Sequence, residues 1–234
     1  MAILWASSCL EEDTTPPDVE GLTLTTGEGY VQDATSETVN IPGDIRIEGA
    51  FSDDVLLLQF ITTLDANFET NYPLSNQTSI TQVDTFYIAG NASVADRKLT
   101  VSNEAASGKY TLNFVASDER ENEANLGPFE INIQNNLPFI GLNMPTTDSV
   151  ALPQSEVLNI EGLVSAHENL STLTIELTTD STEFLVGSFS DIKELTFTID
   201  TSYTSTEKGL HELVISAEDS LGNKSEQRSL VNFL

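Results

Sequence analysis

The sequence is poor in cysteine, basic residues and histidine. Cys9 is its single cysteine, which excludes an internal disulfide and any site built from several cysteines. Lys and Arg together number 9 against 37 Asp and Glu, and the resulting net charge of -28 repels the phosphates of nucleic acids. No stretch is apolar over the roughly 18 residues that a membrane-spanning helix needs. We therefore expect no nucleic-acid partner and no membrane-spanning helix.

The composition is nevertheless that of a folded protein. Hydrophobic residues make up 39% of the 234 residues, which is enough for real cores, and cores usually form over about 100 to 150 residues. The length thus fits one large domain or two ordinary ones.

An internal repeat favours two domains. Residues 47–52 (Ile-Glu-Gly-Ala-Phe-Ser) match residues 160–165 (Ile-Glu-Gly-Leu-Val-Ser), and an apolar strand is expected after each, over 55–64 and 170–177. Residues 108–122 match residues 209–223 in the same order. The chain therefore contains one unit twice.

Alternating apolar and polar residues predict β-strands throughout, and sustained helical periodicity is absent. Several such runs per copy, separated by turn residues, predict an all-β protein of two tandem immunoglobulin-like antiparallel β-sandwiches. We place them at residues 17–134 and 135–234, after a leading segment and tether at 1–16. The linker 135–137 is too short for free movement, so we expect an end-to-end arrangement with limited bending.

Tyr110 follows Gly108 at the start of a predicted strand, which is the spacing of a tyrosine corner. His211 stands at the same place in the second copy, so we expect it to be a strand or corner residue rather than a catalytic one. The second histidine, His167, is expected at the opposite end of its sandwich. A Ser-His-Asp triad is therefore implausible, and we expect a protein that is not an enzyme.

The two copies end their central strand in related turns. Residues 217–223 read Ala-Glu-Asp-Ser-Leu-Gly-Asn, and residues 116–122 read Ala-Ser-Asp-Glu-Arg-Glu-Asn, with Glu121 in place of the glycine. This pattern resembles the uncharacterised tandem immunoglobulin-like or cadherin-like domains of Bacteroidota lipoproteins. The resemblance covers about residues 17–234 and implies a fold more than a function.

The first residues suggest a lipid anchor to a membrane. Residues 1–9 form a short apolar run that ends Ala-Ser-Ser-Cys, and this resembles a bacterial lipoprotein signal in which Cys9 is acylated. The match lacks a basic n-region and its apolar run is short, and a free cysteine is the alternative. Acids at 11–13 resemble a surface-export signal. We expect an outer-membrane lipoprotein displayed on the cell surface, anchored by the lipid on Cys9.

Acids gather at one end of the first predicted sandwich. Its two turns there carry five carboxylates and suggest a calcium site, because calcium takes six to eight oxygen ligands in flexible geometry. The candidate ligands are Asp53, Asp54, Asp118, Glu119 and Glu121. The alternative is that Asp53 and Asp118 cap their turns through hydrogen bonds to the backbone. No cofactor other than calcium is expected.

Two functions remain open at this stage. The first is binding of a glycan or a surface protein, for which Tyr30, Tyr72 and Tyr203 lie in polar, turn-like contexts and are the candidate contact residues. The second is a structural spacer or adhesin module with calcium-stabilised domain ends.

Overall fold

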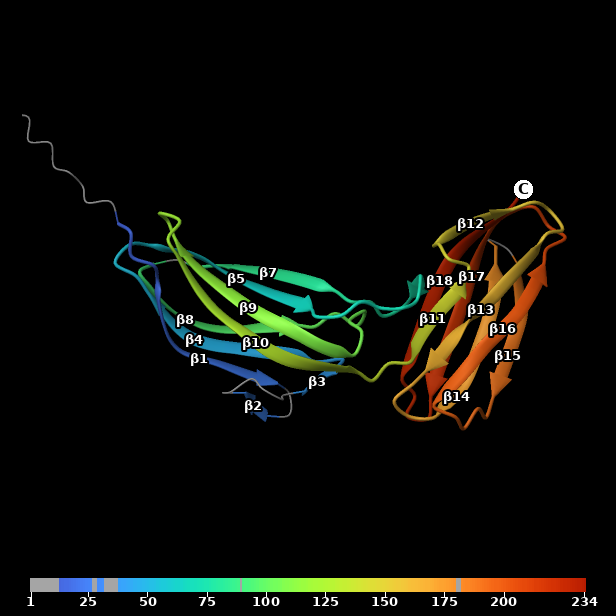
Figure 1. The fold of residues 1–234 in the computed structure, drawn as a ribbon, viewed down its shortest axis with the longest axis horizontal. Coiled ribbons are helices and arrows are strands. Elements are labelled where there is room, and N and C mark those ends of the chain that lie inside the picture. Colours follow the sequence, from blue (N-terminus) through green and yellow to red (C-terminus); the bar gives the residue numbers. More distant parts are fainter. Residues whose placement is uncertain (1–12, 27–28, 32–37, 89, 180–181) are drawn as a thin grey trace, which may run out of the picture.

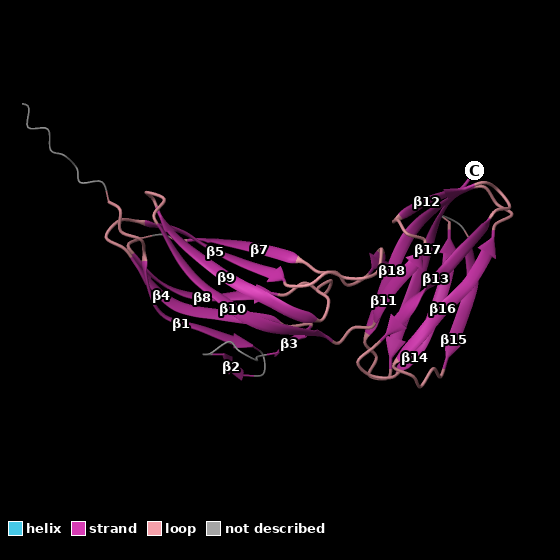
Figure 2. Ribbon diagram, in the orientation of Figure 1, coloured by secondary structure: helices cyan, strands magenta, loops and turns pink. Residues whose placement is uncertain are grey.

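The computed structural model describes residues 13–26, 29–31, 38–88, 90–179 and 182–234, and Cys9 therefore lies outside the described residues. The described chain is all-β and forms two sandwiches, here called domain 1 and domain 2, that lie end to end with a bend between them (Figures 1 and 2). Their strand pairs are antiparallel except β3 with β10 and β12 with β18, which are parallel. No helix in this part of the chain is long and apolar enough to cross a membrane. The prediction of two tandem immunoglobulin-like sandwiches is confirmed.

Domain 1 consists of a four-stranded sheet in the order β2-β1-β4-β8 and a five-stranded sheet in the order β3-β10-β9-β5-β7. Its strands are β1 (Asp18–Thr26), β2 (Gly29–Val31), β3 (Thr38–Ile41), β4 (Asp44–Ser52), β5 (Leu57–Ala66), β7 (Thr81–Tyr87), β8 (Ala92–Thr100), β9 (Gly108–Asp118) and β10 (Glu123–Asn135). Alternate residues of β4 and β9 are buried, as strands with one solvent-facing side require.

Domain 2 repeats this plan with sheets in the orders β16-β13-β11-β6 and β12-β18-β17-β14-β15. Its strands are β11 (Phe139–Met144), β12 (Ser149–Leu152), β13 (Val157–Ser165), β14 (Leu170–Thr178), β15 (Glu183–Ser190), β16 (Thr196–Thr204), β17 (Gly209–Asp219) and β18 (Lys224–Phe233). The exception is β6 (Leu74–Ser75), which comes from the loop between β5 and β7 of domain 1.

Each domain has its own hydrophobic core. In domain 1, stacked and edge-on rings fill the centre, with the ring centroids of Phe60 and Phe114 5.3 Å apart. The core of domain 2 is mostly Leu, Ile and Val, and it includes Leu74 from the domain 1 loop. Domain 1 therefore supplies part of the core of domain 2.

The repeat seen in the sequence is a structural repeat. The matched segments 47–52 and 160–165 lie in β4 and β13, while 108–122 and 209–223 hold β9 and β17 with their following turns. The strand after the first match begins at Leu57 rather than at residue 55, because residues 53–56 form the turn that leads into it.

Candidate functional site

The turn after β9 is organised by a buried carboxylate. One oxygen of Asp118, Oδ1, accepts hydrogen bonds from the backbone N–H groups of Arg120 (2.7 Å) and Asn122 (2.9 Å), and Oδ2 accepts one from the Asn122 side chain (2.8 Å). Burial acts to raise the pKa of Asp118, but these donors outweigh it and the pKa lies below its ordinary value. Asp219 makes the same three bonds in domain 2, to Leu221 and Asn223. Both aspartates thus serve as turn caps.

A second group of acids lies beside the first turn. Carboxylate oxygens of Asp13, Asp53 and Asp54 lie within 4.8 Å of one another, and this is the one group of potential metal ligands among the described residues. Asp13 comes from the tether, where its main chain and side chain both accept bonds from Asn122. From the sequence, Asp13 is expected in the tether and in the surface-export signal, because nothing in the sequence shows that the tether packs against this turn.

Asp53 is the most constrained member of this group. Its Oδ1 accepts a hydrogen bond from the Val55 N–H at 2.8 Å, so it caps its turn as expected, whereas its buried Oδ2 has no partner among the described residues. Burial raises the pKa of Asp53, the Val55 N–H opposes that rise, and the charges of Asp118, Asp54 and Asp13 add to it. The ionised form of Asp53 is therefore destabilised, and a bound cation or a nearby basic group would offset that destabilisation.

The structure thus divides the five acids proposed from the sequence. Asp53 and Asp54 meet each other and Asp13, whereas Asp118 uses both oxygens in its turn. Glu119 and Glu121 do not belong to the group of three among the described residues. Glu121 has a φ of 65°, in the left-handed region, where the second copy has Gly222 with a φ of 85°.

The junction between the domains is a shared sheet. β6 pairs with β11 through Leu74 opposite Leu142 and Ser75 opposite Gly141. Asn76 continues the pairing, since its backbone N–H donates to the Ile140 carbonyl at 3.2 Å and its side-chain oxygen accepts from the Ile140 N–H at 2.7 Å. Figure 1 shows this loop running from domain 1 along the side of β11.

Side-chain contacts reinforce the junction. The Asn76 amide donates to the Pro138 carbonyl at 2.8 Å, and the Gln77 amide donates to the Leu137 carbonyl at 2.9 Å. The ring of Tyr72 meets that of Phe139 edge-on at 5.3 Å and lies over Gly141, where any Cβ would approach the ring to 2.5 Å. Gly141 is therefore needed for the close approach of the two domains.

A cleft of about 370 Å³ lies at this junction. Its aromatic walls come from Phe68, Tyr72 and Phe139, and polar groups from both domains complete it. The polar lining residues are Glu69, Thr70, Asn71, Gln77, Ser107, Gln134, Asn135, Ser165 and His167. Aromatic faces beside amides and hydroxyls can accommodate a partly polar ligand.

The three tyrosines proposed as contact residues lie apart. Tyr72 lies in the junction cleft, whereas Tyr203 is in β16, where it packs against Phe184 and against the core residue Phe233. Tyr30 is in β2, and its side chain lies outside the described residues. The two described side chains therefore do not form a common surface.

Tyr110 and His211 are core residues, as expected. The Tyr110 hydroxyl donates to the Ala106 carbonyl at 2.9 Å, and burial raises its pKa to about 12. The His211 ring is buried between Phe184 and Phe233, with Nδ1 3.0 Å from the Gly209 carbonyl. His167 is exposed at the domain junction, close to Gln134.

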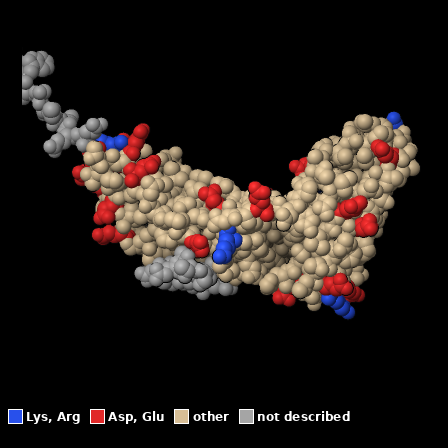
Figure 3. Space-filling view, viewed as in Figure 1, with Lys and Arg blue, Asp and Glu red and all other residues tan. Residues whose placement is uncertain are grey.

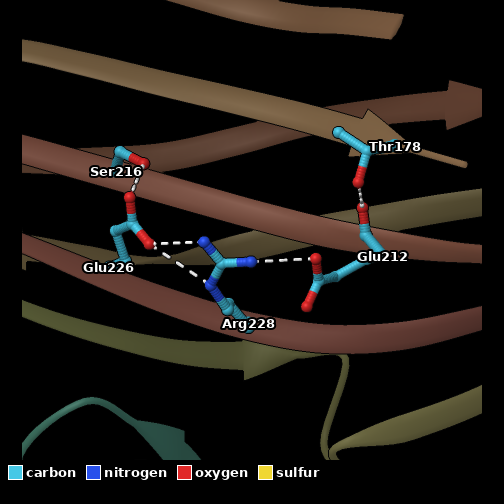
Figure 4. Close-up of polar contacts among 5 residues, drawn as sticks. All are labelled: Thr178, Glu212, Ser216, Glu226 and Arg228. Carbon is cyan, nitrogen blue, oxygen red and sulfur yellow. Dashed lines mark hydrogen bonds and ion pairs between the residues drawn. The ribbon is translucent and has the colours of Figure 1, made fainter. Parts of the chain in front are cut away.

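Acidic side chains are spread over both domains, and several gather at the end of domain 1 that carries the tether (Figure 3). Some basic groups are neutralised locally. On the outer face of domain 2, Arg228 of β18 bonds Glu226 at 2.7 Å and Glu212 at 2.9 Å (Figure 4). The hydrogen bond that Arg228 donates to Glu226, and then the one it donates to Glu212, raise the pKa of Arg228. Such exposed pairs add little stability.

No protein-family model matches the sequence, and a search of curated proteins found no match. Solved structures do resemble the fold. Fibronectin(III)-like modules of Clostridium thermocellum CbhA share 15% identity over 90% of this chain and 93% of theirs, with a TM-score of 0.31. A tetra-tandem repeat from the extending region of a large adhesion protein shares 14% identity over 93% of this chain and 50% of its own, with a TM-score of 0.33. A chimeric titin Z1Z2 tandem shares 13% identity over 94% of this chain and all of its own, with a TM-score of 0.26.

Proposed function

We propose that this chain is a non-enzymatic module of the bacterial cell surface, anchored to the outer membrane through a lipid on Cys9, whose two domains are held in a fixed orientation to present a binding surface. The observation that carries the fixed orientation is the strand β6, by which domain 1 adds a strand to a sheet of domain 2. A spacer or adhesive module must keep its successive domains in a defined orientation relative to one another. Strand pairing across a junction limits bending more than a short linker alone does.

Distance measurement between the domains tests the fixed orientation. Spin labels at Val94 of β8 and Leu185 of β15, which are 80% and 62% exposed, report the separation of the two domains once Cys9 is replaced by serine. We expect one narrow distance distribution that broadens in Leu74→Ala, because that change removes the side chain that β6 buries in domain 2. A broad distribution in the parent protein would show that the domains move independently, and it would refute the proposal.

We place ligand binding, to a glycan or a surface protein, at the junction cleft. The support is the combination of aromatic walls and polar side chains, with Phe139, Ser165 and His167 contributed by domain 2 and the other lining groups mainly by domain 1. A glycan array and a screen of surface proteins would identify the ligand. Phe68→Ala should abolish that binding, while Val94→Ala, an apolar truncation on β8 outside the cleft lining, should not.

Calcium at the end of domain 1 is a second candidate, favoured by the unpartnered buried oxygen of Asp53 inside the group of three aspartates. A cation there would tie the tether, through Asp13, to the turn that holds Asp53 and Asp54. It would offset the repulsion among their charges. The test is thermal unfolding in millimolar calcium and in chelator. An increase in melting temperature that Asp54→Asn abolishes supports the site, and the absence of any increase contradicts it.

A further inference from the structure

The two domains have equivalent ends, which we call the entry ends. Each is formed by the start of the first strand and by two turns, those after β4 and β9 in domain 1 and those after β13 and β17 in domain 2. The strand registers define the equivalence. Asp18 pairs with Ser52 in domain 1 as Phe139 pairs with Ser165 in domain 2. Further in, Leu57 pairs with Asp118 as Leu170 pairs with Asp219. The two entry ends can therefore be compared residue by residue.

The entry end of domain 2 is covered by domain 1, whereas that of domain 1 forms an open hollow of about 450 Å³. The hollow is lined by Thr15, Pro16, Asp18, Ser52, Asp53 and Asp54. The equivalents of the last five are Leu137, Phe139, Ser165, Ala166 and His167, and all of them line the interdomain cleft. Domain 1 thus leaves exposed the surface whose equivalent in domain 2 is covered by a loop.

The sheet edge that receives β6 also has an equivalent in domain 1. Both the N–H and the C=O of Ile140 point outward and bond Asn76. Val19 occupies the same register in β1, opposite Phe51 as Ile140 is opposite Val164. Within the described residues, β2 pairs only with Leu24–Thr26, so the first part of β1 has no strand on its outer side. An edge of this kind can accept a strand.

The chemistry of the two entry ends is different. In domain 2 the positions around the received loop hold Phe139, Ala166 and His167, and in domain 1 the equivalents are Asp18, Asp53 and Asp54. The loop that covers domain 2 carries Glu69 and would be repelled by these carboxylates. A second copy of this chain, with its net charge of -28, is likewise disfavoured. Charge complementarity requires a basic occupant.

We propose that the entry end of domain 1 docks an extended strand of a separate protein, which adds to the outer edge of β1 and places lysine or arginine side chains against Asp18, Asp53 and Asp54. The strand would lie as β6 lies on β11, with a side-chain amide bonding the backbone of Val19. Its basic groups would stand where Tyr72 meets Phe139 in the domain junction.

A peptide derived from the domain 1 loop that contains β6 tests this proposal. The probe is a synthetic peptide of residues 67–80 in which Glu69 and Tyr72 are replaced by lysine, added to the full chain in calcium-free buffer and followed by fluorescence anisotropy. We expect it to bind about tenfold more tightly than the unmodified peptide, with an affinity that falls as salt rises. Val19→Pro should weaken binding about tenfold, since proline lacks the outward N–H.

Matched variants separate docking from a general attraction to an acidic protein. Asp18→Asn with Asp54→Asn should weaken binding of the lysine peptide, and Glu130→Gln with Glu156→Gln, which removes two exposed acids elsewhere, should leave it unchanged. Equal loss in both double variants, equal binding of the two peptides, or no binding at 1 mM peptide would each overturn the proposal. None of these outcomes bears on the rigidity of the domain junction, which the spin labels measure separately.

Discussion

Replacing Asn76 by alanine should weaken the domain junction by about 2–4 kcal/mol. The side chain makes two hydrogen bonds across the junction, at 2.8 Å to the Pro138 carbonyl and 2.7 Å from the Ile140 N–H. Losing the bond to the Pro138 carbonyl costs about 1 kcal/mol net, and leaving the amide of the buried Ile140 without a partner costs about 1–3 kcal/mol. The loss falls on the pairing of β6 with β11.

Hydrogen exchange at the backbone amide of residue 76 measures this loss, because that N–H donates to the Ile140 carbonyl in both proteins and is released when β6 detaches. A loss of about 3 kcal/mol corresponds to exchange faster by about a hundredfold through that opening. Urea unfolding of domain 2 should shift to lower concentration by about 1–2 M for an m-value of about 2 kcal/mol/M.

Asn71→Ala is the control, because Asn71 lies exposed on the same loop and lines the cleft without a hydrogen bond to domain 2 among the described residues. It should leave both exchange and unfolding unchanged. Equal protection of the residue 76 amide in the parent and in Asn76→Ala would refute the view that the Asn76 side chain holds β6 on β11.

Three further perturbations test the turns and the core. Asp219→Ala removes three hydrogen bonds and should lower the free energy of unfolding by about 3 kcal/mol or more in urea, whereas Ser220→Ala beside it should have little effect. Tyr110→Phe leaves the Ala106 carbonyl without its donor and should cost about 1–3 kcal/mol in the same assay. The pKa of Asp53 is raised on folding, so protonation of Asp53 stabilises the native state as pH falls through that pKa. Asp53→Asn should therefore raise the melting temperature at pH 7 in chelator, and this gain should shrink toward pH 4. A gain that does not change with pH would contradict the raised pKa of Asp53.

Much of the fold could be predicted from local patterns. Alternation in strands such as β9 and β17 reports which side faces the core, and the spacing of Gly108 and Tyr110 marks the corner that the Ala106 carbonyl completes. The capping role of Asp118 is also one of the alternatives that the sequence offers, because aspartate side chains commonly bond the backbone of their own turn.

The junction could not be predicted in this way. Residues 67–80 contain Asn, Pro, Ser and Gln, which is the composition of an ordinary surface loop, and nothing local shows that Leu74 is buried in another domain. The same limit applies to Asp13, which joins Asp53 and Asp54 only because the tether packs against the turn that Asn122 holds. Long-range contacts of this kind depend on the tertiary arrangement rather than on residue preference.

Comparison of the two copies also separates residues that the sandwich fold requires from residues that are specific to one domain end. The turn caps Asp118 and Asp219 and the buried Pro17 and Pro138 occupy the same places in both domains, as a shared scaffold requires. The entry ends differ where they meet other groups, with Asp54 at the position of His167. Carboxylates that only keep a surface soluble need not converge around a buried oxygen such as Asp53 Oδ2, since their repulsion costs stability. The acidic entry end of domain 1 is therefore better explained by an occupant of positive charge than by solubility.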